Sequence, residues 1–220
     1  MNPLIKRDPQ IWREHRVVVL AGMYDYHATT GECYETRTLA DMFDLNPTCK
    51  PKQHGPAFIP SSYAKYDARS HAVQQAHGSF VALTAEVDDG DHALAAVAGA
   101  IASCAGSAAH LIYSSPHARP GDRRWRAILP LAGPVPHAEW HDGQTALCDH
   151  LELVGIRPDR ALCRAAQPVF LPNVPRIQTK TCKPLRGHNG EPIFSCGVRP
   201  GSMRLAYCLI EALSRLELPA

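Results

Sequence analysis

Long apolar runs are missing from this sequence. No stretch of its 220 residues approaches the roughly 18 apolar residues that a membrane-spanning helix needs. The first ten residues, MNPLIKRDPQ, also lack the apolar segment of a secretory signal. We therefore expect a cytoplasmic protein with no membrane partner.

Cysteine motifs are missing as well. The chain has eight cysteines, but no two are spaced as C-x-x-C, and a disulfide framework is not expected in a long cytoplasmic chain. Cys33, Cys49 and His54 form an alternative zinc-binding set, although their spacing differs from that of common zinc modules. Free thiols are the simpler prediction.

A strong charge bias and a P-loop are also absent. The net charge is only +2, so bulk charge neither requires nor excludes a nucleic-acid partner, and any such contact must come from a local patch. Without a P-loop motif, we expect no fused helicase domain. The length predicts one large domain or one domain with an accessory lobe.

The most informative stretch of the sequence is residues 80–131. Residues 80–88 alternate, so one face of the predicted strand is purely apolar and the other ends in Glu86 and Asp88. Two acids on one face can share a divalent cation, and Mg²⁺ prefers one or two carboxylates plus substrate phosphates. Asp89 and Asp91 are predicted turn and helix-cap residues. The alternative is that one of them replaces Glu86 as a ligand.

Two further strands come after this one. A helix is predicted over 91–105, and a strand over 110–115 leads into Ser115-Pro-His117. The next strand, 124–131, places Arg124 and Arg126 on the face opposite Trp125. Three strand ends thus deliver acids, then Ser and His, then arginines, which are the groups that a metal-bound triphosphate requires.

These motifs resemble the catalytic core of archaeo-eukaryotic-type primases, in particular the small primases of phages and plasmids. The family's acid-x-acid strand is matched by Glu86-Val-Asp88, its Ser-x-His motif by Ser115-Pro-His117, and its basic strand by Arg124-Trp-Arg126. The likeness covers residues 63–175, about half of the chain. The first acid of the family is usually Asp, so Glu86 is a departure with a longer side chain.

The resemblance implies a DNA primase or primase-polymerase that condenses nucleoside triphosphates on a single-stranded DNA template. The implied catalytic acids, which would also hold Mg²⁺ or Mn²⁺, are Glu86, Asp88 and Asp159. The implied nucleotide-binding residues are Ser115, His117, Arg124 and Arg126. The implied setting is the replication of a phage, plasmid or integrated element, with a replicative helicase as an optional partner.

The order of elements predicts an α+β (α/β) fold. From residue 80 onward the order is strand, helix, strand, strand, helix over 138–154 and strand over 168–171, the βαββαβ pattern of an RNA-recognition-like or ferredoxin-like sheet. We expect two helices to cover one face of this sheet and the other face to be open and to carry the site. Residues 1–79 are expected to form an accessory αβ lobe, and 80–220 the catalytic core with a C-terminal helix over 203–217.

Several local signals outside the central stretch are also predictive. Strands are expected over 17–23 and 33–37, followed by a short helix that begins at the capping box of Thr38 and Asp41. Residues 46–62, rich in Pro, Lys and Gly, are expected to form an irregular loop. Residues 134–136 are expected to break the chain after the third core strand.

Two rival functions use a similar sheet. A non-catalytic nucleic-acid-binding domain of the RNA-recognition type usually displays aromatic residues for base stacking, whereas the central strands here offer acids and arginines. A rolling-circle replication nuclease needs a His-x-His pair, and the sequence contains none.

Overall fold

The computed structural model describes residues 11–48, 50–106, 108–115, 117–119 and 121–173, together with the backbone of residues 194–197. Cys49 of the alternative zinc set and the predicted helix over 203–217 lie outside these ranges. Within them, no helix combines the length and the apolar character that a membrane crossing requires.

The fold is α+β, as predicted, and the part of the chain that the structure describes forms two four-stranded sheets. The strands are β1 (Arg16–Leu20), β2 (Glu35–Thr38), β3 (Ala57–Ile59), β4 (Ser79–Val87), β5 (His110–Ser114), β6 (Trp125–Pro136), β7 (Val169–Phe170) and β8 (Phe194–Gly197). The α-helices are α1 (Leu39–Phe43), α2 (His71–His77), α3 (Leu94–Ala105) and α4 (His137–Leu153). Short 3-10 turns occupy Ile11–Glu14 (η1), Lys52–His54 (η2) and Arg160–Cys163 (η3).

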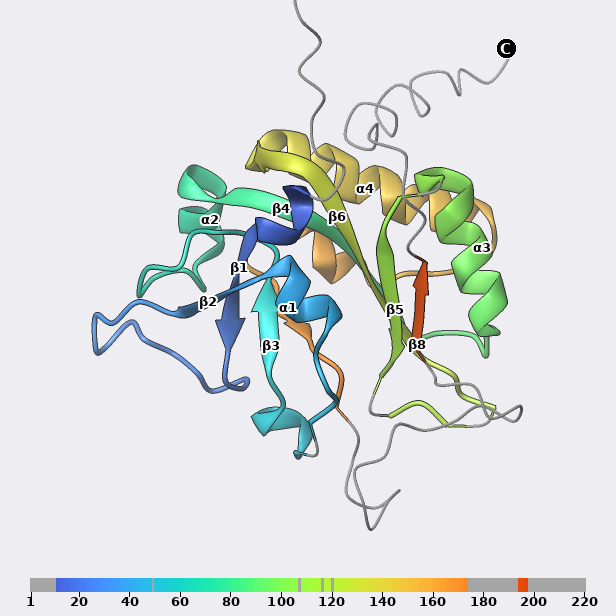
Figure 1. Cartoon of the computed structure of the whole chain (residues 1–220), viewed down its shortest axis with the longest axis horizontal. Helices are drawn as coiled ribbons and strands as arrows, with labels where there is room; N and C mark the ends of the chain where they lie inside the picture. The colour runs from blue at the N-terminus through green and yellow to red at the C-terminus, as the bar shows by residue number, and fades with distance from the viewer. Residues whose placement is uncertain are drawn as a thin grey trace, which may run out of the picture.

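The first sheet has the strand order β2-β1-β3-β7 and is antiparallel throughout (Figure 1). The capping box is confirmed, because the Thr38 side chain accepts from the Asp41 backbone N–H and the Asp41 carboxylate accepts from that of Thr38. The loop prediction for 46–62 is wrong at its centre, where β3 lies between β1 and β7 with all three of its residues buried. A three-residue strand between prolines is too short to show a period.

The second sheet has the order β4-β6-β5-β8. The succession β4, α3, β5, β6, α4 confirms the predicted order up to the second helix. The final strand of the predicted unit is β7, and it pairs with β3 of the first sheet rather than with this one. The position beside β5 is instead occupied by β8, which was not predicted.

A β-bulge near the start of β4 corrects the predicted alternation. The register shifts between Phe80 and Ala82, so Phe80 packs with Leu83 on the helix-covered face, while Val81 and Ala82 both pack toward the first sheet. One extra residue in a strand moves the side chains that precede it to the opposite face of the sheet. From Leu83 onward the predicted alternation holds, and Glu86 keeps its predicted face.

Both faces of the second sheet are covered, which corrects the prediction of an open face. Helices α3 and α4 pack on the face of Leu83, Trp125 and Leu129. The opposite face contributes Leu111, Tyr113 and Ile128 to a second core that also contains Val17, Val19, Phe58 and Val169 from the first sheet. The two sheets therefore pack against each other (Figure 1), because each has an apolar face to remove from water.

Strand β6 is longer than predicted. It continues to Pro136 instead of ending near residue 131, and its far end pairs with the start of β4, Ser79 opposite Pro136 and Phe80 opposite Val135. Proline lacks the N–H that a central strand position needs, but it is tolerated at strand ends and bulges. Strand β6 contains Pro130, Pro134 and Pro136. All three lie beyond Ile128, the last residue of β6 that pairs with β5, so only β4 is beside β6 there.

Candidate functional site

The strand register gathers the predicted site residues at one end of the second sheet. Glu86 of β4 lies opposite Arg126 of β6, and Arg126 lies opposite Tyr113 of β5. One step nearer the strand ends, Val87, Trp125 and Ser114 form the next row. Beyond this row, Ser115 and Arg124 are neighbours, and the Ser115 backbone N–H donates to the Arg124 carbonyl at 2.9 Å.

Glu86 and Arg126 form a buried ion pair. Arg126 Nε donates to Glu86 Oε1 at 2.9 Å, and Nη2 donates to the same oxygen. The Arg126 and Glu86 side chains are 1% and 12% exposed, respectively. Arg126 Nη1 is buried with no hydrogen-bond partner in the part of the chain that the structure describes. Arg126 is therefore covered, in contrast to its predicted place on an open face.

The cover over Arg126 comes from residues that were not predicted to belong to the site. The Phe170 ring centre of β7 lies 5.5 Å from the Arg126 guanidinium carbon, and Tyr113 donates its hydroxyl to the Phe170 carbonyl at 2.8 Å. Burial raises the pKa of Tyr113. Tyr113 could have been found from the sequence, because it lies two residues before Ser115 and a strand repeats its face with that spacing.

Asp88 and Arg124 lie at the exposed end of the same face. Asp88 is exposed and contributes to raising the pKa of Arg124, although the larger cause is the hydrogen bonding of Arg124 to Asp122. Arg124 Nε and Nη2 donate to the two Asp122 carboxylate oxygens at 3.0 and 3.2 Å. Arg124 is thus positioned by an acid of its own turn.

Ser115 and His117 differ in accessibility. Ser115 is buried, its carbonyl accepts from the Ala118 N–H at 3.0 Å, and its hydroxyl accepts weakly from the His117 N–H at 3.5 Å. The His117 side chain is exposed. These contacts shape a turn at the end of β5 that leaves the imidazole in solvent beside the sheet end.

Asp159 reaches the same region through its backbone. Its N–H donates to the Glu86 carbonyl at 2.7 Å, so the segment before η3 runs along the free edge of β4. Its carboxylate caps η3 by accepting from the Ala161 N–H at 2.8 Å. The structure therefore places the Asp159 backbone next to the Glu86 backbone, while the Asp159 carboxylate is bonded to the Ala161 N–H.

The alternative acid Asp91 has a different role from the predicted helix cap. Its carboxylate accepts from Arg123 Nε at 2.7 Å, from Nη2 at 2.9 Å and from the Arg123 N–H at 2.9 Å. These bonds to Arg123 lower the pKa of Asp91. Helix α3 instead begins after Ala93, which provides no side-chain cap. The Asp91–Arg123 contact fixes the loop after β4 to the start of β6.

The three predicted acids are not gathered into one cluster within the described residues. No group of three or more His, Cys, Asp or Glu side chains that could hold a metal ion occurs in the described ranges. Arg126 occupies Glu86 Oε1, and the Asp159 carboxylate caps η3. The metal-binding roles of Glu86, Asp88 and Asp159 therefore stay predictions.

Comparisons with known proteins give one structural match. No protein-family model matches the chain, and no curated protein matches it. Among solved structures, the chain is similar to the archaeo-eukaryotic primase (AEP) domain of the cyanophage S-2L primase-polymerase, with a TM-score of 0.45 and 16% sequence identity. The match covers 90% of this chain and 88% of that one. A likeness this distant does not establish an activity, so the functional evidence lies in the residues of this chain.

Proposed function

We propose that the protein is a nucleotidyltransferase of the primase or primase-polymerase class, which joins nucleotides from nucleoside triphosphates on a single-stranded DNA template. One observation carries the proposal. The register of β4, β6 and β5 brings the acid-x-acid, Arg-x-Arg and Ser-x-His segments to the same sheet end. The motifs lie up to 40 residues apart in the sequence, and their meeting at one sheet end is what a shared site requires.

The accessible residues of this end divide into two chemical kinds. His117 and Arg124 would donate to the phosphate oxygens of an incoming nucleotide, since charge-assisted hydrogen bonds are the strong ones for phosphate. Asp88 is an exposed acid just beyond the end of β4, close enough to Arg124 to help raise the pKa of that arginine. The Glu86–Arg126 pair lies one layer deeper and would hold β4 and β6 in the alignment that keeps these groups together.

A second candidate function is a non-catalytic nucleic-acid-binding domain. The observation that favours it is the pairing of Glu86 with Arg126, because an acid so engaged is unavailable as a free catalytic carboxylate. This candidate predicts binding to single-stranded DNA without product formation.

Asp88→Asn tests the proposal. The amide is a poor substitute for a carboxylate as a ligand or base, so the variant should lose nucleotide incorporation almost completely. Asp88 is exposed, so the free energy of unfolding should change by no more than about 0.5 kcal/mol. The measurement is primer synthesis and extension on single-stranded DNA, with Mg²⁺ and with Mn²⁺, together with thermal unfolding.

Asp89→Asn is the matched control, because Asp89 is 69% exposed and pairs only loosely, at 3.5 Å, with Arg157. It should keep wild-type activity. Full activity in Asp88→Asn would place the catalytic acid elsewhere. Wild-type protein that binds the template and makes no product with either metal would decide for the non-catalytic candidate.

A further inference from the structure

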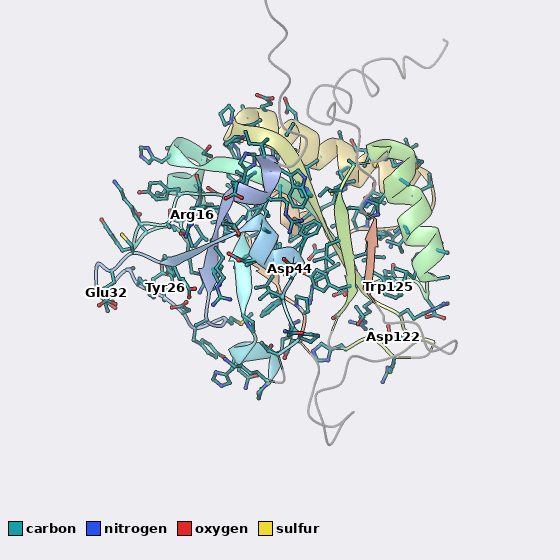
Figure 2. The ribbon with its side chains drawn as sticks, viewed as in Figure 1. Arg16, Tyr26, Glu32, Asp44, Asp122 and Trp125 are labelled. Atoms are coloured by element: carbon teal, nitrogen blue, oxygen red, sulfur yellow. The ribbon has the colours of Figure 1, made fainter. Side chains whose placement is uncertain are left out.

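The loop between β1 and β2 presents aromatic side chains to solvent. Tyr24 is 74% exposed and Tyr26 is 58% exposed, and their neighbour Met23 is 46% exposed. Exposed apolar side chains form a patch when they are close together, and these three lie within four consecutive residues. Figure 2 shows Tyr26 on the opposite side of the molecule from Trp125 and Asp122.

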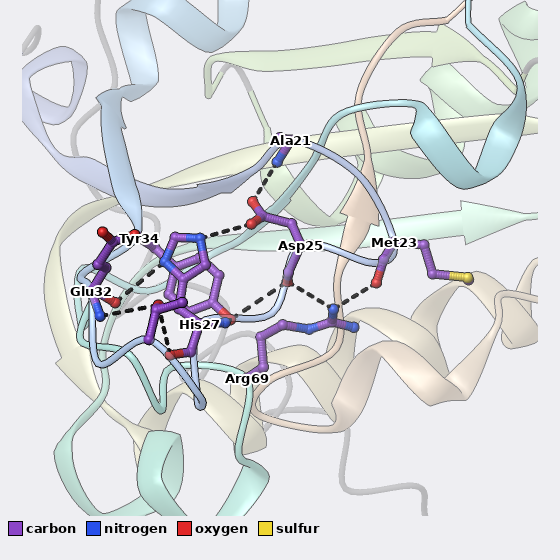
Figure 3. Close-up of polar contacts among 8 residues, drawn as sticks. Ala21, Met23, Asp25, His27, Glu32, Tyr34 and Arg69 are labelled. Carbon is purple, nitrogen blue, oxygen red and sulfur yellow. Dashed lines mark hydrogen bonds and ion pairs between the residues drawn. The ribbon is translucent and has the colours of Figure 1, made fainter.

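The side chain between the two tyrosines holds this loop in one conformation (Figure 3). The Asp25 carboxylate accepts from the Ala21 N–H at 2.7 Å and contacts His27 Nε2 at 2.8 Å. The His27 ring stacks on Tyr34 with the ring centres 4.0 Å apart and the planes 3° from parallel. Residue 25 therefore points inward, while the residues on either side of it point out.

Arg69 completes the support from another part of the chain. Its Nη1 donates to the Met23 carbonyl at 2.6 Å and to the Asp25 carbonyl at 3.1 Å (Figure 3). Its guanidinium carbon also lies 5.5 Å from the centre of the Tyr26 ring. A loop held in this way loses little conformational freedom when it binds a partner.

Cationic side chains border the aromatic patch. The Met23 N–H donates to the Gln53 carbonyl at 2.9 Å, which brings η2 beside the loop, and the rings of Tyr24 and His54 meet edge to face at 6.4 Å. Lys52, exposed on the same turn, has its ammonium 5.5 Å from the Phe170 ring centre. The carboxylate of Asp25 is turned into the loop network, so it adds no outward negative charge between the tyrosines.

We propose that Tyr24 and Tyr26, together with Arg69 and Lys52, form a stacking platform for single-stranded nucleic acid. Every base has an aromatic face, so exposed tyrosines bind unpaired bases with little sequence preference, while neighbouring cations follow the phosphates. A duplex hides its base faces and would not be held in this way. The inference rests on the nucleic-acid partner of the proposed function, but it does not require catalysis.

A small cavity lies beside the loop and Arg69. It has a volume of about 240 Å³, and its lining includes Met23, Arg69, His71 and Phe170. Typical small-molecule sites measure roughly 300–1,000 Å³, so this cavity suits a single ring rather than a whole nucleotide. Phe170 also lies against Arg126, so one wall of the cavity is part of the cover over the Glu86–Arg126 pair.

Fluorescence anisotropy with a labelled 20-mer of deoxythymidine tests the platform. Base stacking is worth about 1–3 kcal/mol per base, so Tyr24→Ala and Tyr26→Ala should each weaken binding by roughly 5- to 150-fold, and the double variant should weaken it further. The same variants should leave the weaker binding of a 20-base-pair duplex unchanged. Thermal unfolding should match wild type, because both side chains are largely exposed.

Two control variants sharpen this test. Leu153→Ala removes an apolar side chain that is 76% exposed at the end of α4, and Glu32→Gln removes an exposed charge from the same loop. Leu153→Ala should bind the 20-mer like wild type, and Glu32→Gln should bind it equally or more tightly. Wild-type affinity in both tyrosine variants, or no binding of the single strand by wild type, would overturn the proposal. Binding by wild type without nucleotide incorporation would overturn the proposed catalytic function and leave the platform intact.

Discussion

The Glu86–Arg126 pair allows a prediction about stability that is separable from activity. The informative substitutions are Arg126→Met and Glu86→Leu, singly and together. Arg126 is 1% exposed and Glu86 is 12% exposed, so either single substitution leaves an uncompensated charge between two packed sheets. Removing one partner of a buried pair costs about 3–5 kcal/mol, a large share of the roughly 5–15 kcal/mol that stabilise a typical domain.

The double variant should recover most of this loss. Replacing both members of a buried ion pair by apolar side chains of similar volume is often neutral or stabilising, so the two single effects should not add. We expect a coupling energy of about 2 kcal/mol or more, near the upper part of the range for residues in direct contact. Arg124→Met is the control, because Arg124 is 32% exposed and solvent-exposed pairs contribute at most about 1 kcal/mol.

Urea unfolding followed by circular dichroism measures these free energies, and nucleotide incorporation is measured on the same samples. If the pair is structural, the double variant should regain stability together with activity. If Glu86 also serves as a catalytic acid, stability should return and activity should not. Single variants that cost less than about 1 kcal/mol, or effects that simply add, would refute the assignment of a buried, coupled pair.

Two further predictions concern titratable groups. Burial lowers the pKa of His71 below its usual 6.5, and His71 Nδ1 accepts a hydrogen bond from the Ala166 N–H at 3.0 Å. As pH falls, the His71 imidazole is therefore protonated in the unfolded chain before it is protonated in the folded protein. The free energy of unfolding should then decline as pH falls through about 6.5. His71→Asn keeps an acceptor that cannot be protonated, so its melting temperature should fall less between pH 7 and pH 5, and an equal fall would contradict this role. The Sγ atoms of Cys163 and Cys148 are 3.8 Å apart, and the hydrogen bond from Cys148 lowers the pKa of Cys163, whereas burial raises that of Cys104 to about 11. Iodoacetamide at pH 7 should therefore label Cys163 well before Cys104 in a peptide mass map, and the reverse order would contradict the shift.

The elements that the sequence predicted well are those with a long or chemically specific signal. Helix α4 runs over 17 residues, long enough for its apolar spacing to be read, and α1 begins at the Thr38–Asp41 capping box, which depends on two neighbouring side chains. Strand β3 has three residues, which is too few for periodicity. The bulge at residues 80–82 also left no local signal, because it is decided by pairing with β6.

The site was predictable as a set of residues but not as a set of contacts. The motifs at Glu86, Ser115 and Arg126 do lie at one end of one sheet. Which acid faces which arginine depends on the register of β4 against β6. These two strands are not joined by a hairpin, so their register is set by the match of their apolar faces over the whole strand and not by either motif. Phe170 covers Arg126 because β7 pairs with the first sheet. A two-residue strand is too short for its sequence to predict which sheet it joins.

The pairing of β3 with β7 also affects the protein during its synthesis. Phe58 of β3 pairs with Val169 of β7, which is far along the sequence. The outer edge of β3 therefore stays unpaired until almost all of the described chain has left the ribosome. An apolar strand with an open edge is a template for pairing with another chain, and such transient edges favour aggregation of incomplete products. The two residues of β7 thus complete a surface that nascent chains expose for most of translation.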